Sequence, residues 1–213
     1  MKLSETENKK IQVISVEKMR KSDAYTIENF VESKELMYRA ASGVFESFKG
    51  WNDKKIAIVV GGGNNGGDGY ALAGILKKNC IESILYKVSD KMSEDGKYYC
   101  DIAVDLGVEI KDFDENTSLN EYDVIIDCIL GTGFSGDVRG KAKDAILSIN
   151  KSNAYVISVD INSGMNGDTG EAAIAVKSDL TVSIGYYKKG LFCEPAKEYI
   201  KELTNVDIGI ILV

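Results

Sequence analysis

Three loops with residue types that can do chemistry each follow a short apolar run in the sequence. The first is GGGNNGGDG at residues 61–69, and the second begins at Asp127 and includes GTGFSGD at residues 131–137. The third, SVDINSG at residues 158–164, carries an aspartate and a serine. The chain has no histidine, which excludes Ser-His-Asp and Cys-His nucleophile systems, histidine-bound metals and histidine general bases. Acid–base chemistry must therefore come from carboxylates, lysine, tyrosine, cysteine or water.

The glycine-rich string at residues 61–69 has two functional interpretations and one structural interpretation. It satisfies G-x-G-x-x-G, and Asp90 follows the next apolar run at about the separation of a ribose-binding aspartate, as in a dehydrogenase. Asp68 argues against this, because it would lie at the amino end of the following helix, where a diphosphate needs bare backbone N–H groups. A P-loop is disfavoured because no Lys-Ser/Thr pair closes the string. In the structural interpretation, Asp68 only caps the helix and the glycines only form a tight turn.

The elements that must position these loops alternate between strands and helices. Two amphipathic helices are predicted first, because apolar residues recur at helical spacing over residues 16–30 and 36–48. Strands are then predicted at residues 55–60, 83–88, 108–111, 123–127, 154–159 and 179–184, and helices at residues 70–78, 94–106 and 141–150. Near-continuous apolar strands separated by helices predict an α/β fold. We expect a Rossmann-like three-layer α/β/α sandwich with a mostly parallel central sheet and the two N-terminal helices.

The order of the strands decides whether the three loops share one site. In the common order 3-2-1-4-5, the strands that end at Val60, Asp127 and Val159 are neighbours, and the order reverses between the first two. Asn65, Asp127 and Ser163 would then bring together an amide oxygen, a carboxylate and a hydroxyl, which are hard oxygen ligands. A single carboxylate favours a monovalent cation over Ca²⁺ or Mg²⁺. A water-filled, hydrogen-bonded loop junction without a cation is an equally good interpretation of these residues.

Composition and charge exclude several classes of protein. The 213 residues suffice to bury a core without disulfides, and no repeat or linker divides the chain, so we predict a single domain over residues 1–213. A formal net charge of −7 argues against nucleic acid as a partner. The polar residues 1–15 do not form a signal peptide pattern, and no apolar run reaches the length of a membrane span. The four cysteines form no CxxC pair and are expected to be reduced, which predicts a cytoplasmic protein.

Six motifs run along nearly the whole chain in an order typical of one protein family. They are ELMYRA at residues 35–40, NNGGDG at 64–69, DxxxGTGFxGD at 127–137, VDINSG at 159–164, TVSIGYYKKGL at 181–191 and VDIGI at 206–210. With these motifs the chain closely resembles the YjeF N-terminal domain family, the NAD(P)H-hydrate epimerases. In the family's pattern the first motif is an amino-terminal helix, the second a signature loop and the last the closing strand. Asn162 stands in place of the family's proline, and Tyr38 in place of its usual acidic residue.

The resemblance implies an enzyme that interconverts the R and S epimers of hydrated NADH and NADPH. A partner ADP- or ATP-dependent dehydratase, specific for one epimer, could then repair both. The resemblance also implies bound K⁺, with Asn65, Asp127 and Ser163 as its ligands, and a dinucleotide site with Asp160 beside the reacting ring. The residues of that site are Asn64, Asn65, Gly66, Gly67, Asp68, Gly131, Thr132, Gly133, Phe134, Ser135, Gly136, Asp137 and Asp160.

The chemistry of such a hydrate needs few groups from the protein. Its hydroxyl lies on a ring carbon beside nitrogen, so lone-pair donation supports loss of the hydroxyl and return of water from the other face. We expect Asp160 to give a proton to the departing oxygen and to accept one from the returning water. Lys188 is the reserve candidate, although a lysine in KKG is more often solvated surface. K⁺ would organise the loops, because a monovalent ion is a weak Lewis acid.

Two other classes of protein remain as alternatives. A non-catalytic binding or scaffold module has the same family fold, but it would have no chemical reason to keep Asn65, Asp127, Asp160 and Ser163. An NAD-dependent oxidoreductase would consume reduced cofactor, whereas an epimerase leaves the redox state unchanged. The two amino-terminal helices could also form the seam of a homodimer, although their periodicity equally describes packing within one chain.

Overall fold

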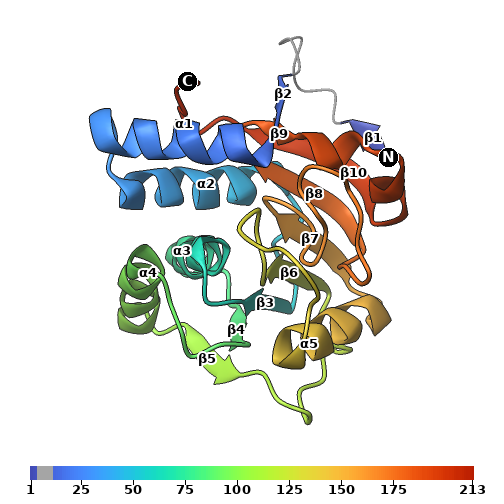
Figure 1. Ribbon diagram of the computed structural model, residues 1–213. Coiled ribbons are helices and arrows are strands. Elements are labelled where there is room, and N and C mark those ends of the chain that lie inside the picture. The colour runs from blue at the N-terminus through green and yellow to red at the C-terminus, as the bar shows by residue number, and fades with distance from the viewer. Residues whose placement is uncertain (4–11) are drawn as a thin grey trace.

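An eight-stranded parallel β-sheet forms the centre of the computed structural model, which describes residues 1–3 and 12–213 (Figure 1). Across the sheet the strands are β1 (Lys2–Leu3), β10 (Ile200–Val206), β8 (Ser178–Ile184), β7 (Tyr155–Val159), β6 (Val124–Cys128), β3 (Ile56–Val60), β4 (Ile84–Lys87) and β5 (Glu109–Asp112). Each neighbouring pair is parallel. The order reverses between β3 and β6, so the predicted order 3-2-1-4-5 is confirmed for β5, β4, β3, β6 and β7.

Helices cover both faces of this sheet, which confirms the predicted three-layer sandwich (Figure 1). The helices are α1 (Val16–Asn29), α2 (Ser33–Ser47), α3 (Asn64–Lys78), α4 (Glu94–Asp105) and α5 (Gly140–Lys151), and η1 (Lys189–Phe192) and η2 (Glu194–Glu198) are short 3₁₀ turns. In β3, Ile58 and Val60 pack toward α2 and α3, whereas Ala57 and Val59 pack toward α5. This alternation follows from the strand geometry, because successive side chains point to opposite faces. A strand buried on both faces is apolar at successive positions, and the strands were predicted from this continuous apolar pattern.

Two elements differ from the expectation. Helix α3 begins at Asn64 rather than at residue 70, so the NNGGDG segment forms its first turns. Glycines lower helix propensity, but tertiary packing outweighs this, because a Cβ at Gly66 would overlap the carbonyl oxygen of Gly61. The last strand, β10, ends at Val206, where the expected closing strand VDIGI begins. The chain turns out of the sheet there, since Asp207 accepts a hydrogen bond from the N–H of Gly209, whose φ is +86°.

A second, two-stranded parallel sheet pairs β2 (Val13–Ile14) with β9 (Tyr187–Lys188) and joins the segment before α1 to the segment after β8. Within the described residues, no helix is both long and apolar enough to cross a bilayer. The amino-terminal segment in which no signal peptide was recognised falls mainly on residues 4–11, which lie outside the described part of the chain. The four cysteines are free thiols.

Candidate functional site

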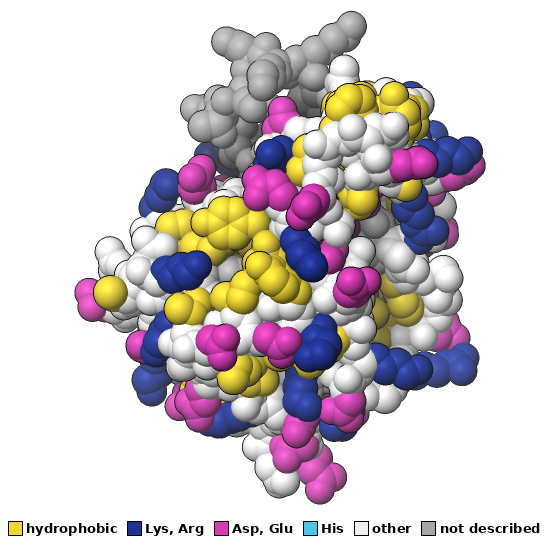
Figure 2. All heavy atoms as spheres, turned by 90° about the vertical axis from the view of Figure 1, so that its left-hand side faces the viewer, with side chains coloured by type: hydrophobic (Ala, Val, Ile, Leu, Met, Phe, Trp, Pro, Cys, Tyr) yellow, Lys and Arg dark blue, Asp and Glu magenta, His cyan; other side chains and the backbone are white. Residues whose placement is uncertain are grey.

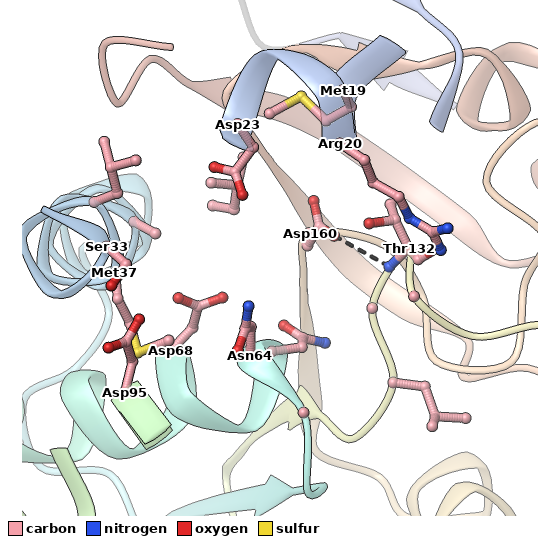
Figure 3. A pocket seen from close by; sticks show the side chains of 18 of the residues that line it. Met19, Arg20, Asp23, Ser33, Met37, Asn64, Asp68, Asp95, Thr132 and Asp160 are labelled. Atoms are coloured by element: carbon pink, nitrogen blue, oxygen red, sulfur yellow. Dashed lines mark hydrogen bonds between the residues drawn. The ribbon is translucent and has the colours of Figure 1, made fainter. Parts of the chain in front are cut away.

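A pocket of about 520 Å³ opens at the carboxyl ends of β3, β6 and β7, and α1 and α2 form its other wall (Figure 3). This volume lies in the range of small-molecule sites. The three glycine-rich loops contribute to the pocket through residues 62–65, residues 129–134 and Asp160. The structure thus brings the predicted loops into one crevice, at the point where the strand order reverses.

The predicted dinucleotide residues divide into a lining group and a supporting group. The lining group is Asn64, Asn65, Asp68, Gly131, Thr132, Gly133, Phe134 and Asp160. Gly66 and Gly67 instead allow close packing. A Cβ at Gly66 would overlap the carbonyl oxygen of Gly61, and a Cβ at Gly67 would meet the side chain of Met37 in α2 and the backbone of α4. Ser135, Gly136 and Asp137 are exposed and lie outside the pocket lining.

Asp160 follows β7 and is held by contacts from two other segments. One of its carboxylate oxygens accepts a hydrogen bond of 3.4 Å from the N–H of Thr132, and the other forms an ion pair with Lys188 Nζ. Its φ is +68°, a left-handed conformation that aspartate tolerates better than most residues. The Asp160 side chain is 15% exposed and that of Lys188 is 1% exposed. The expectation that Lys188 is solvated surface is therefore wrong.

Lys188 can be buried because the end of β8 and the loop after β7 provide acceptors for its ammonium group. It donates to the carbonyl oxygen of Ile184 at 2.7 Å and to Ser183 Oγ at 3.4 Å, in addition to the ion pair with Asp160. A buried charge needs such partners, since loss of one partner would leave it uncompensated. The pair consequently fixes the position of the Asp160 carboxyl group on the pocket wall.

Three further carboxyl groups line the same pocket, those of Asp23, Asp68 and Asp95. Figure 3 shows Asp23 of α1, Asp68 of α3 and Asp160 pointing into one space from three different elements. Burial, followed by the charges of Asp160 and Asp23, raises the pKa of Asp68 well above its usual range, and Lys188 counteracts this in part. Burial and the charge of Asp160 also raise the pKa of Asp23. The pocket therefore holds carboxyl groups with different proton affinities, as acid–base sites commonly do.

The three residues predicted to bind K⁺ lie in and beneath the wall of this pocket. Asp127 is fully buried, and its carboxylate accepts hydrogen bonds from Ser158 Oγ at 2.8 Å and from the N–H of Ser163 at 2.9 Å. The hydroxyl of Ser163 also donates to this carboxylate and accepts from the N–H of Leu130 at 2.8 Å. Burial raises the pKa of Asp127, and these donors oppose the increase. The tips of β6 and β7 are thus joined directly.

Asn65 faces the pocket from the first turn of α3. It is 7% exposed, and its amide oxygen and nitrogen have no hydrogen-bond partner among the described residues. A Cβ at Gly131 would lie 3.1 Å from Asn65 Cβ and 3.4 Å from Asp160 Oδ2, so the absence of a side chain there leaves room between the two groups. No described contact links Asn65 to Asp127. A buried amide without a partner indicates a place for a polar ligand or an ion.

Several lining residues were not predicted as site residues. They are mainly on α1 and α2 and include Met19, Arg20, Asp23, Met37 and, on α4, Asp95. The helical spacing of the apolar residues over 16–30 indicates only that one face of this helix is covered. The sequence did contain one indication that this helix lines a site. Arg20 and Asp23 are charged, lie three positions apart and flank the apolar face of the same helix.

Two interpretations of the first glycine-rich loop are not supported by the structure. Asp90 is exposed, forms an ion pair of 2.8 Å with Lys87 and does not line the pocket, so it is not placed as a ribose-binding aspartate. Asp68 does not cap α3, because the N-cap is Gly63 and no side chain caps it. Asp68 instead lies one turn inside the helix, on the side that faces the pocket.

The comparisons with known proteins agree with this fold and site. A sequence model described as YjeF-related protein N-terminus matches residues 33–190. A protein of Oenococcus oeni named NAD(P)H-hydrate epimerase is 37% identical over 205 residues, covering 92% of this chain and 96% of the relative. A Dictyoglomus turgidum protein named bifunctional NAD(P)H-hydrate repair enzyme Nnr is 39% identical over 184 residues, covering 82% of this chain and 36% of that protein.

A solved structure supports the fold independently. The crystal structure of yeast YNL200c aligns with a TM-score of 0.78 at 19% identity, covering 91% of this chain and 88% of the yeast chain. Identity this low supports only the fold, whereas the sequence-model match covers most of the chain, including all three loops that line the pocket. The chain therefore belongs to the YjeF-related N-terminal family.

Proposed function

We propose that this chain is an NAD(P)H-hydrate epimerase, an isomerase that interconverts the R and S epimers of hydrated NADH and NADPH. The observation that carries the proposal is Asp160, ion-paired to Lys188 on the wall of a pocket built from the three glycine-rich loops. The names of relatives from Oenococcus oeni and Limosilactobacillus reuteri support the same activity. The exposed position of Asp90 gives no support to the NAD-dependent oxidoreductase alternative.

The reaction needs a proton to move in each direction. The ring nitrogen donates its lone pair as the C–O bond breaks, and the departing oxygen leaves as water after it takes a proton. Water then adds to the other face of the iminium-like ring and loses a proton, so the net proton count is unchanged. We assign these transfers to Asp160, whose carboxylate faces the pocket, takes up the first proton from protonated Asp68 and returns a proton to Asp68 after water has added. Asp68 lies in the same pocket with a raised pKa and could hold a proton close to the reacting oxygen.

The donor set beneath the pocket fits K⁺. Asp127 carries a fully buried carboxylate with no basic partner among the described residues, and the Asn65 amide has no partner at all among them. Together with the Ser163 hydroxyl, these are hard oxygen donors with one negative charge, which suits a monovalent ion. We propose that Asn65, Asp127 and Ser163 hold K⁺. The ion would supply positive charge beneath the loops, and the proton transfers would remain with the protein's carboxyl groups.

The wider setting of the enzyme is also proposed. Some relatives are named bifunctional repair enzymes, which supports a dehydratase as the functional partner. Free cysteines suit a reducing compartment, in line with the cytoplasm. The homodimer stays a prediction. The face over the ends of α1 and α2 and over α4 mixes apolar with charged side chains (Figure 2), and its exposed apolar residues include Tyr25, Phe30, Tyr38 and Tyr98.

A coupled assay tests the activity. The protein is mixed with R-hydrate of NADH and a dehydratase that accepts only the S-hydrate, and clearance of the R-hydrate is followed by chromatography. We expect clearance faster than spontaneous inversion, and Asp160→Asn should lower kcat by about 10²- to 10⁴-fold. Asn tolerates the left-handed backbone at this position. Clearance no faster than in a protein-free control would overturn the proposed function.

The matched control is Asp144→Asn, an exposed aspartate on α5 that lies outside the pocket lining. It should leave the rate unchanged. Because Asp160→Asn removes the ionised partner of Lys188, circular dichroism and thermal unfolding must show that this variant is folded. A folded Asp160→Asn protein with a near-normal rate would remove Asp160 from the mechanism.

The proposed ion is tested by replacing K⁺ with Na⁺ or Li⁺ at constant ionic strength. We expect a lower rate and a lower melting temperature, since an ion that binds only the folded state stabilises it. Asp127→Asn should abolish both responses to K⁺. Identical melting temperatures in all three salts would contradict K⁺ binding here.

A further inference from the structure

The charges that line the pocket pose a problem for a dinucleotide substrate. Among the described lining residues, four are acidic, Asp23, Asp68, Asp95 and Asp160, and two are basic, Arg20 and Lys188. The hydrate of NADH carries a diphosphate with two negative charges at neutral pH. A basic side chain free to bind this group would offset its repulsion by the acidic residues of the pocket.

Lys188 is already fully engaged. Its ammonium group contacts Asp160, the carbonyl oxygen of Ile184 and Ser183 Oγ. A lysine has three N–H donors, so none remains for a phosphate oxygen. Its side chain is also only 1% exposed, which keeps it behind the pocket wall.

Arg20 is differently placed. It extends from α1 toward the loop after β6, and its Nη2 donates to the carbonyl oxygen of Thr132 at 2.8 Å (Figure 3). Its side chain is exposed and forms no ion pair with a described carboxylate. A guanidinium has five N–H donors, and this bond uses one of them. The remaining donors lie at the edge of the pocket, on the Thr132 side and away from Asp68 and Asp95.

We propose that Arg20 binds the diphosphate of the hydrated dinucleotide and thereby orients the nicotinamide end toward Asp160; this rests on the proposed function. The bond to Thr132 holds the guanidinium at the glycine-rich loop, which keeps its planar fork in a fixed direction. Such a fork binds two phosphate oxygens at once, unlike a lysine. With the diphosphate held at this edge, the reacting ring lies deeper in the pocket, among the carboxyl groups.

The test compares three substrates that differ in phosphate content. They are the hydrates of NADH, of reduced nicotinamide mononucleotide and of reduced nicotinamide riboside, which carry a diphosphate, one phosphate and none. We expect Arg20→Gln to lower kcat/KM about 10- to 100-fold for the NADH hydrate, mainly through KM. The loss should be smaller for the mononucleotide and absent for the riboside. Arg20→Lys should recover part of the loss, because it keeps the charge but not the fork.

The matched control is Lys18→Gln, which removes the same charge from an exposed position on the same helix outside the pocket lining. It should leave all three substrates unaffected. Equal losses with the three substrates in Arg20→Gln would mean that Arg20 only orders the loop, and this would overturn the proposal. No loss with any of them would overturn it as well.

A binding measurement separates this proposal from the proposed function. The affinity for ADP-ribose, which has the diphosphate but no nicotinamide, is measured by calorimetry for the wild type, Arg20→Gln and Lys18→Gln. Weaker binding in Arg20→Gln alone supports a diphosphate site even if the wild type epimerises none of the hydrates. Equal affinity in all three proteins would refute Arg20 as the diphosphate ligand even if the epimerase activity is present.

Discussion

Asp68 shows how a carboxyl group in the pocket also changes the pH dependence of stability. Burial and the charges of Asp160 and Asp23 raise its pKa, so the folded protein keeps a proton that the unfolded chain loses above about pH 4. The contribution of Asp68 to stability is therefore fully present below that pH. It is lost as pH rises toward the pKa of the folded state.

Asp68→Asn cannot ionise, so this loss should disappear in the variant. We expect its free energy of unfolding to match the wild type near pH 4 and to exceed it at pH 8, by about 1.4 kcal/mol for each pH unit between the two pKa values. Urea unfolding across this pH range measures the difference. Asp144→Asn, an exposed control, should follow the wild type throughout. A constant offset at every pH would contradict the raised pKa of Asp68.

Asn162 holds the loop after β7 in place through the hydrogen bonds of its side chain. It is fully buried, donates to the carbonyl oxygens of Val176 at 2.9 Å and Tyr199 at 3.1 Å, and accepts from Thr181 Oγ1 at 2.7 Å. It also donates to Ser178 Oγ at 2.9 Å. Hydrogen bonds to three segments thus fix the loop that carries Asp160 and Ser163.

Asn162→Ala should therefore be strongly destabilising. The substitution leaves several buried polar groups without partners, and each such group costs about 1–3 kcal/mol. We expect the free energy of unfolding to fall by at least about 2 kcal/mol, measured by urea titration. Asn120→Ala, in an exposed loop, is the control and should be nearly neutral. A neutral Asn162→Ala would mean that water or loop movement replaces these bonds.

Among the elements, α3 depends on close contact between its glycines and the strand before it. A Cβ at Gly66 would overlap the carbonyl oxygen of Gly61, which is backbone and cannot rotate away. Gly74, in the same helix, has neighbours no closer than 3.5 Å, at the side chain of Leu106. The two glycines therefore make different demands on the packing, although the intrinsic helix propensity of both is equally poor.

This contrast gives a matched pair of variants. Gly66→Ala should push the first turn of α3 away from β3, lower stability by about 1–3 kcal/mol and reduce activity by displacing Asn64 and Asn65. Gly74→Ala should be neutral or stabilising by up to about 1 kcal/mol, since alanine favours a helix. Thermal unfolding and the coupled epimerase assay measure both. Equal effects of the two substitutions would show that helix propensity, rather than contact with β3, governs this helix.

In the whole molecule, the last described residues hold α1 against the pocket. The N–H of Ile211 donates to Thr26 Oγ1 at 2.9 Å, and the N–H of Val213 donates to Ser22 Oγ at 3.2 Å. Both hydroxyls belong to buried residues of α1, the helix that carries Arg20 and Asp23 into the pocket (Figure 1). The site thus depends on contacts between the two ends of the chain.

Thr26→Val should loosen this connection while preserving the shape of the side chain. We expect a loss of about 0.5–1.5 kcal/mol, because the partly buried hydrogen bond from the N–H of Ile211 is removed. Amide hydrogen exchange should increase in α1 and at residues 208–213, whereas β3 and β6 should stay protected. Ser118→Ala, at an exposed loop position, is the control. Uniformly faster exchange across the sheet would indicate global destabilisation instead.

The sequence by itself predicted six strands of the sheet, the order of β5, β4, β3, β6 and β7, and the crevice, whereas β1 and the position of β10 were not predicted. Strands buried on both faces must be apolar throughout, so their ends and the polar loops after them could be recognised locally. The prediction correctly placed Asp127 and Asp160 at the carboxyl ends of neighbouring strands, because connections between parallel strands can follow only a few topologies.

Only the tertiary structure decided what surrounds those loops. The start of α3 depends on contact between Gly66 and Gly61, which overrides the propensity of glycine. The burial of Lys188 and its pairing with Asp160, and the entry of Arg20 into the pocket, depend on residues between 28 and 112 positions apart in the sequence. Local patterns carry no information on such contacts, because their energies come from neighbours that only the folded chain brings together.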